Sequence, residues 1–236
     1  GSGAGIGSGE SAYGDATITI TGGDIKAEGY DGAGIGTGRN AGGDLTLNIS
    51  GEDTKINAVS KWGAGIGSGQ GVGGDYDITI DGGTIEATGA TGIGIGRQDG
   101  DKANANITIN SGKITATGTE YGAGIGNGCG NVRRETNITI TGGDITAIGD
   151  DGAAGIGDGQ GAWDNTVNVE ITGGNITAIG GKGASAIGGG RYDGYRGGTK
   201  IIVKVDGSNR ALKTAAIVQG DSKGAIGEGT NEEEDP

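Results

Sequence analysis

Short alternations of aliphatic and polar residues recur along the chain in pairs, and a glycine pair separates the two members of each pair. The first pair is Thr17–Thr21 and Asp24–Gly29, on either side of Gly22-Gly23, and the same order returns at 77–87 and 137–147. Period-2 alternation of β-branched residues bounded by glycines is typical of a strand, a turn and a second strand. No window shows convincing 3.6-residue periodicity, so the pattern predicts almost no helix.

A glycine-rich motif precedes each of these strand pairs. It first appears as Gly-Ala-Gly-Ile-Gly-Ser-Gly at 3–9 and returns at 32–38 and 63–69, with looser copies further along. A fixed period near 30 residues indicates one supersecondary unit stacked on itself. The motif isoleucines are separated by 29 to 31 residues, and by 39 in the last interval: Ile6, Ile35, Ile66, Ile95, Ile125, Ile156, Ile187 and Ile226.

The repeat predicts an all-β fold, a right-handed parallel β-helix of about seven to eight coils with ~30 residues and three short strands per coil. Each strand would pair with its equivalent one coil away, giving a rod roughly 35–40 Å long. Residues 1–228 would form this single domain, and the acidic segment 229–236 would be a linker or disordered tail. The inward-facing set in the first coil would be Ala4, Ile6, Ile18, Ile20, Ile25 and Ala27.

The glycines of the motif would then point outward. Glycine weakens a strand, so its repetition indicates a steric requirement. Two interpretations remain open. In the first, the motif forms a tight corner or lies under the chain's own loops; this is the more common reason for glycine in a strand. In the second, a ligand lies flat against the glycine face.

Composition excludes several classes of protein. The chain has 61 glycines without a Gly-X-Y period, which excludes collagen. Its formal net charge of −13 argues against binding to nucleic acids or to anionic membranes, because both are negatively charged. No apolar run is long enough for membrane insertion. Cys129 is the single cysteine and histidine is absent, so no disulfide framework or Cys/His metal site is expected. Because the chain opens inside a motif, we expect it to be part of something longer.

Aromatic residues are the candidate ligand-binding side chains. All eight, six Tyr and two Trp, are expected in loops beside the glycine motif and none in the alternating strands. Amphipathic rings kept out of a core can stack on sugar rings. The alternative is that each ring only covers a corner of a coil. The candidates for carbohydrate binding are Tyr30, Trp62, Tyr121, Trp163, Tyr192 and Tyr195.

Acidic residues near the motif are weaker candidates for a Ca²⁺ site, because loop carboxylates can share this ion with backbone carbonyls. They are Asp31, Asp150 and Asp151, and a solvated acidic surface is the favoured explanation of them. An enzyme would need a localised cluster of acidic and basic groups. The only such segments are 133–135 and 191–196, so we expect no catalytic activity. Ice binding is also disfavoured, since each predicted threonine column holds only three consecutive threonines.

The sequence Ile-Thr-Ile-Thr-Gly-Gly-Asp-Ile at 18–25 and 138–145, with Asp-Gly-Ala-Gly-Ile-Gly at 31–36, carries a resemblance. The chain resembles the glycine-rich parallel β-helix repeats of bacterial (clostridial-type) surface proteins, and it is similar to the polysaccharide-binding β-helix carbohydrate-binding family. That resemblance spans roughly residues 3–227. The related group more often has Asp-Gly-Ile at the motif, so no calcium ligands are carried over to this chain.

The resemblance implies a secreted or cell-surface module that binds a polysaccharide or host glycan without catalysis, with Ca²⁺ as a candidate cofactor. We expect the module to be a monomer. A purely structural spacer or stalk is the alternative, and an ice-binding protein or a polysaccharide lyase-type enzyme is less favoured. Two exposed tryptophans would contribute little to a spacer, which is what favours the binding interpretation.

Overall fold

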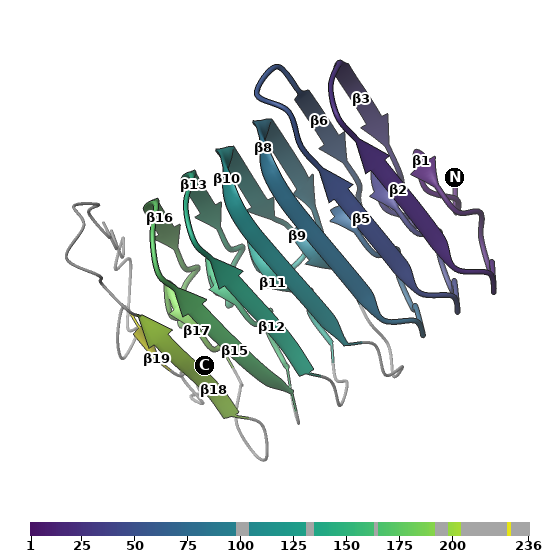
Figure 1. The fold of residues 1–236 in the computed structure, drawn as a ribbon. Helices are drawn as coiled ribbons and strands as arrows, with labels where there is room; N and C mark the ends of the chain where they lie inside the picture. The colour runs from purple at the N-terminus through teal and green to yellow at the C-terminus, as the bar shows by residue number, and fades with distance from the viewer. Residues whose placement is uncertain (98–103, 131–134, 163–164, 192–197, 204–225, 228–236) are drawn as a thin grey trace.

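A computed structural model describes residues 1–97, 104–130, 135–162, 165–191, 198–203 and 226–227. Within this part the chain is all-β and contains no helix, so no helix there is long and apolar enough to cross a membrane. Parallel strands stack coil upon coil into a solenoid (Figure 1). The chain runs along the front sheet, crosses to the back and advances toward the C-terminus, which is right-handed winding. The predicted fold class is confirmed.

Each coil contributes a glycine strand followed by two longer segments. Six coils are described in all three segments, a seventh in two, and an eighth in its glycine strand alone. The glycine strands form one eight-stranded sheet: β1 (Ile6–Gly7), β4 (Ile35–Gly36), β7 (Ala64–Gly67), β9 (Thr91–Ile95), β11 (Ile125–Asn127), β14 (Ile156–Gly157), β17 (Ile187–Gly188) and β19 (Ile226–Gly227).

The two alternating segments of each coil form a second, bent sheet of eleven strands. In two coils the predicted pair of short strands is one continuous strand through the glycine turn, which corrects the expectation of three separate strands: β8 (Tyr76–Gly89) and β10 (Ala105–Gly118). The remaining strands are β2 (Ala16–Ile20), β3 (Asp24–Glu28), β5 (Leu45–Ile49), β6 (Lys55–Val59), β12 (Glu135–Ile140), β13 (Asp144–Ile148), β15 (Thr166–Ile171), β16 (Asn175–Ile179) and β18 (Gly198–Val203).

The core is a set of aliphatic ladders along the solenoid axis. Equivalent residues pair directly between neighbouring coils, as in Ile78 with Ile107 and Ile107 with Ile138. The side chains of these three isoleucines are at most 1% exposed. Stacking like residues one coil apart buries nearly all of each aliphatic side chain, which stabilises each by roughly 1.5–3 kcal/mol. Of the inward-facing set predicted for the first coil, Ile20 and Ala27 are buried, and Ile18 and Ile25 are partly buried against the core, whereas Ile6 is 36% exposed. Ala4 is partly exposed.

Each glycine motif contains a short strand and closes on itself as a corner. In the second coil the Ala33 N–H donates back to the Thr37 carbonyl, 2.9 Å away, and Gly36 between them has φ +140°. The same closure recurs at Ala64 and Ser68. The outward glycines are therefore covered by the chain itself, since a Cβ on Gly34 would lie 2.6 Å from the carbonyl oxygen of Gly65. Of the two interpretations, the tight corner is correct.

The fourth coil begins earlier than the sequence spacing predicted. Ile93, and not Ile95, pairs with Ile66 in the preceding coil and with Ile125 in the next. The segment reads Gly-Ile-Gly-Ile-Gly, so either isoleucine fits the motif, and equal spacing favoured the wrong one. Ile95 is still buried and lies level with Asn127.

Candidate ligand-binding edge

The predicted aromatic residues lie where the chain passes from the third segment of one coil to the glycine corner of the next. The closure of that corner brings the residues before the motif beside those that follow it. Thus the Arg39 N–H donates to the Ser2 carbonyl (2.7 Å), and the Arg97 N–H donates to the Trp62 carbonyl (3.1 Å). We call this surface the corner edge: Ser2, Tyr30, Asp31, Arg39, Lys61, Trp62, Arg97, Tyr121, Asp150, Asp151, Gln160 and Arg191.

Three of the six candidate rings belong to the described residues, and all three lie on the corner edge. Tyr30 is 47% exposed and Tyr121 is 46% exposed, while Trp62 is half-buried. Trp62 and Tyr121 directly precede the motif, with one coil between them, and Tyr30 lies one residue earlier, level with Lys61. Equivalent positions of successive coils stack about 4.8 Å apart, so these rings follow one side of the solenoid. Trp163, Tyr192 and Tyr195 lie outside the described residues.

Cations occupy the space between the rings, a feature that the sequence analysis missed. Lys61 Nζ lies 5.0 Å from the Trp62 ring centroid and 5.4 Å from that of Tyr30. The Arg97 guanidinium carbon lies 5.2 Å from the Trp62 ring. Each such contact contributes roughly 0.5–1 kcal/mol at an exposed site. The tryptophan ring is therefore held in place by two cations of an otherwise acidic protein.

Tyr121 has an unusual backbone. Its φ is +67°, in the left-handed region, and the corresponding residues of the next two coils are Gly152 (φ +71°) and Gly183 (φ +77°). A non-glycine residue in this conformation costs roughly 1–2 kcal/mol. The Tyr121 N–H donates to the Asp150 carboxylate, 2.9 Å away, which helps to hold the turn. The chain thus keeps an exposed ring at a position where glycine fits better.

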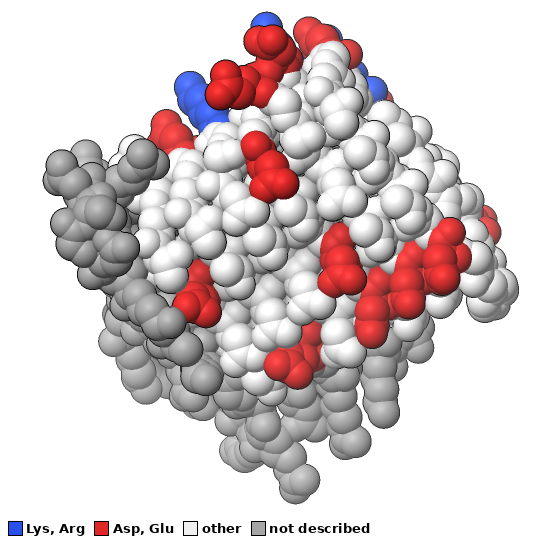
Figure 2. All heavy atoms as spheres, viewed as in Figure 1, with Lys and Arg blue, Asp and Glu red and all other residues white. Residues whose placement is uncertain are grey.

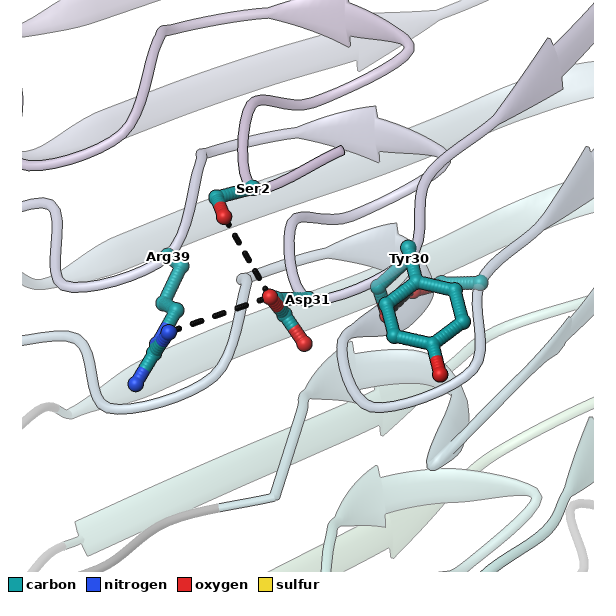
Figure 3. A network of polar contacts seen from close by, with 5 residues as sticks. Ser2, Tyr30, Asp31 and Arg39 are labelled. Carbon is teal, nitrogen blue, oxygen red and sulfur yellow. Dashed lines mark hydrogen bonds and ion pairs between the residues drawn. The ribbon is translucent and has the colours of Figure 1, made fainter.

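The three candidate calcium ligands are engaged by their own chain. Asp31 contacts Arg39 at 3.9 Å and accepts a hydrogen bond from the Ser2 hydroxyl at 3.3 Å, while the Tyr30 ring lies beside this pair (Figure 3). Asp151 pairs with Arg191 at 3.1 Å. Among the described residues, no group of three or more His, Cys, Asp or Glu side chains lies close enough to hold a metal ion. Asp31 and the 150–151 pair are also four coils apart.

A row of carboxylates follows a different line on the solenoid, near the starts of β2, β5 and β8 (Figure 2). Each carboxylate accepts a hydrogen bond from the backbone N–H of its counterpart in the next coil: Asp15 from Asp44 at 3.0 Å, Asp44 from Asp75 at 2.9 Å, and Asp75 from Asn104 at 2.9 Å. The row therefore serves coil stacking, which the sequence analysis did not foresee.

A buried polar cluster is the other feature that the sequence did not reveal. The Asp158 carboxylate is 1% exposed and accepts hydrogen bonds from Asn127 Nδ2 at 2.7 Å and Asn165 Nδ2 at 3.4 Å. The Thr136 hydroxyl donates to Asn127 Oδ1 at 2.9 Å. Asn127 and Asp158 directly follow the glycine corner, where earlier coils carry Thr37 and Ser68. The cluster links the corner to the second segment from inside.

Comparison with known proteins agrees with the fold. A family model described as Beta helix repeat matches residues 18–39, 47–70, 107–129, 138–160 and 169–191. Each match begins in the second segment of a coil and ends just after the next glycine corner, so each match lies within one turn of this solenoid. No curated protein and no solved structure matches the chain. In its fold, the chain is a parallel β-helix built of repeats.

Proposed function

We propose that this β-helix is a non-catalytic glycan-binding or adhesive module of a secreted or cell-surface bacterial protein, with the corner edge as its binding surface. The observation that carries the proposal is Tyr121. Its exposed ring occupies a left-handed backbone position where the next two coils have glycine. Residues held in a backbone conformation that they disfavour concentrate at functional sites.

The rest of the corner edge supports this assignment. Tyr30 and Trp62 follow the same side of the solenoid, and Lys61 and Arg97 place N–H donors beside their rings. Aromatic faces next to hydrogen-bond donors suit a sugar, which has apolar C–H faces and a rim of hydroxyl groups. Successive coils could contact successive units of an extended chain. The covered glycines take no part, because the chain itself lies over them.

Two side chains of the segments considered for catalysis make contacts between coils. Arg191 is paired with Asp151, and the Glu135 carboxylate accepts a hydrogen bond from Asn168 Nδ2 at 3.0 Å. Residues 131–134 and 192–197 lie outside the described residues.

A structural spacer is the second candidate, and the Trp62 contacts favour it. Two cations already hold this ring, which is what a corner-stabilising residue requires. Trp62→Ala separates the two functions. Under either function the loss of two cation–π contacts lowers the melting temperature by about 2–8 °C. For a binding ring the affinity for the glycan also falls, whereas for a spacer no binding changes.

Retention on a panel of insoluble polysaccharides and a glycan array, each with and without Ca²⁺, tests the proposal. We expect retention on at least one glycan, and loss of that retention in the Tyr30→Ala/Trp62→Ala double variant. Tyr13→Ala is the matched control, because Tyr13 is 82% exposed and lies off the corner edge. No retention on any glycan under either condition would leave the spacer as the function.

A further inference from the structure

Two arginines of the corner edge are neutralised by the chain itself. Arg39 contacts the Asp31 carboxylate at 3.9 Å (Figure 3), and Arg191 contacts that of Asp151 at 3.1 Å. Each arginine follows a glycine corner, and each carboxylate belongs to the short segment that leads into a corner. Asp31 leads into the same corner that Arg39 follows, and Asp151 leads into the corner before that of Arg191. An arginine after a corner therefore finds its acid in one of these two segments.

Arg97 follows the corner of the fourth coil in the same way, but the segment that leads into this corner contains no acid. Two strand pairings fix the register on either side of that segment: Val59 with Thr88 and Ala64 with Thr91. Between these pairings the third coil has residues 60–63, whereas the fourth coil has only Gly89 and Ala90. The shortened segment therefore offers Arg97 no counterpart of Asp31.

The segment that leads into the preceding corner supplies no acid to Arg97 either. Two backbone hydrogen bonds identify the equivalent positions: the Arg97 N–H donates to the Trp62 carbonyl at 3.1 Å, and the Arg191 N–H donates to the Gly152 carbonyl at 2.7 Å. In the sixth coil the residue before the accepting carbonyl is Asp151, the partner of Arg191. In the third coil it is Lys61. A second cation therefore lies where the sixth coil has a carboxylate.

Lys61 and Arg97 are thus the cations of the corner edge that the chain leaves without an acid. In the part of the chain that the structure describes, neither has a carboxylate within 4.0 Å. Both lie near the Trp62 ring, and Lys61 also donates to the Tyr30 hydroxyl at 3.5 Å. An aromatic ring attracts a cation but does not neutralise its charge. The two side chains therefore hold N–H donors and positive charge for an anionic group of a ligand.

We propose that the corner edge binds an acidic polysaccharide, in which isolated sugars of an otherwise neutral chain carry a carboxylate, and that Arg97 and Lys61 hold this carboxylate. A guanidinium group matches a carboxylate with two parallel N–H donors. This inference rests on the proposed glycan binding and specifies the class of glycan.

The charges around the rings explain why the neighbouring sugars should be neutral. Tyr30 lies beside Asp31, and the Tyr121 N–H donates to the Asp150 carboxylate. The coil order places these two rings on either side of the Lys61 and Arg97 pair, so an acidic sugar at either ring would meet a carboxylate. The remaining charge of the chain, −13 in total, acts weakly at this distance, because the Debye length at physiological ionic strength is about 8 Å.

The test compares polysaccharides that differ only in charge. Hyaluronan and gellan carry carboxylates on some of their sugars, and each is immobilised with its carboxylates intact or methyl-esterified. We expect the unmodified chain to bind an intact form about ten- to a hundredfold more tightly than its ester, the factor that one charge-assisted hydrogen bond contributes. This comparison needs no variant, so it decides the proposal even where a substitution prevents folding.

A pair of double variants tests the two cations. Lys61→Gln/Arg97→Gln should lose the preference for the intact form. The matched control is Lys26→Gln/Lys113→Gln, which changes the net charge equally at two exposed lysines of β3 and β10. We expect the control to bind as the unmodified chain does.

The outcomes separate this inference from the proposed function. Equal binding of the intact and esterified forms, or binding of neutral cellulose alone, would overturn the acidic ligand and leave glycan binding in place. Equal loss of binding in both double variants would overturn the role of Arg97 and Lys61, because a general effect of net charge would then explain it. Retention on no glycan, charged or neutral, would overturn the proposed function and this inference with it.

Discussion

Replacing Gly36 with alanine should separate the second and third coils. Gly36 lies at the glycine corner with φ +140°, and a Cβ there would be 1.8 Å from the Gly67 carbonyl oxygen. Side-chain carbons rarely approach another heavy atom within 3.0 Å, so the two backbones would have to separate by about 1.2 Å, the difference between these distances. Such a movement breaks the pairing of β4 with β7.

The expected loss of stability follows from two contributions. The backbone strain of a non-glycine residue at this φ costs roughly 1–3 kcal/mol. Each lost hydrogen bond of the pairing costs about 1 kcal/mol, and about two are at risk. The sum is about 3–5 kcal/mol. For a chain of this length, 1 kcal/mol corresponds to about 2–4 °C, so the melting temperature should fall by roughly 6–20 °C.

Thermal unfolding followed by far-ultraviolet circular dichroism measures this loss. The control is Gly9→Ala, on the N-terminal face of the first coil, where a Cβ has no neighbour within 4 Å and φ is not positive. We expect the control to melt within about 2 °C of the unmodified chain. Equal melting temperatures for Gly36→Ala and the unmodified chain would refute the steric explanation of the glycine corner.

Three further predictions concern the ladders and the corner edge. Ile138→Ala should cost about 2–5 kcal/mol in denaturant unfolding, because the side chain is 1% exposed, whereas the half-buried Ile18→Ala should cost clearly less; equal losses would contradict the ladder. Asp75→Ala should cost about 1 kcal/mol by removing the acceptor of the Asn104 N–H, and Asp75→Asn should restore most of it; an unstable Asn variant would contradict the stacking role. Trp62→Ala should lower the affinity for a bound glycan several-fold, while the loss of two cation–π contacts lowers the melting temperature by about 2–8 °C; an unchanged affinity would place the ligand elsewhere.

The coil pattern could be predicted from the sequence because each ladder position repeats the same residue type. The register of Ile78, Ile107 and Ile138 follows directly from the alternation. Tyr76 shows the limit of that reasoning. It was expected in a loop, but it begins β8, pairs with Leu45 and Ala105, and is 1% exposed. Its spacing of two residues before Ile78 carried that information.

The corner edge could be predicted only in part. Exposure of Tyr30 and Tyr121 followed from their place outside the alternation, but the positions of Lys61 and Arg97 did not. Arg97 lies 35 residues from Trp62 in the sequence and reaches it because the glycine corner folds back. That closure depends on the left-handed backbone of Gly94, a three-dimensional property that no residue spacing expresses.

A side-chain ladder outside the core was also missed. Asn106 Nδ2 donates to Asp77 at 2.7 Å, Asn137 Nδ2 to Asn106 at 3.1 Å, and Asn168 Nδ2 to Asn137 at 2.8 Å. Recurrence of an amide at one register position was the available signal, since stacked amides can pair along parallel strands.

Retention of Tyr121→Gly on a polysaccharide bound by the unmodified chain tests the proposed function most directly. Glycine suits φ +67° better than tyrosine does, so the variant should be at least as stable as the unmodified chain while its retention falls at least tenfold. A loss of binding could then not be attributed to unfolding. Full retention by this variant, or failure of the unmodified chain to bind any glycan, would contradict the assignment of the corner edge as a glycan-binding surface.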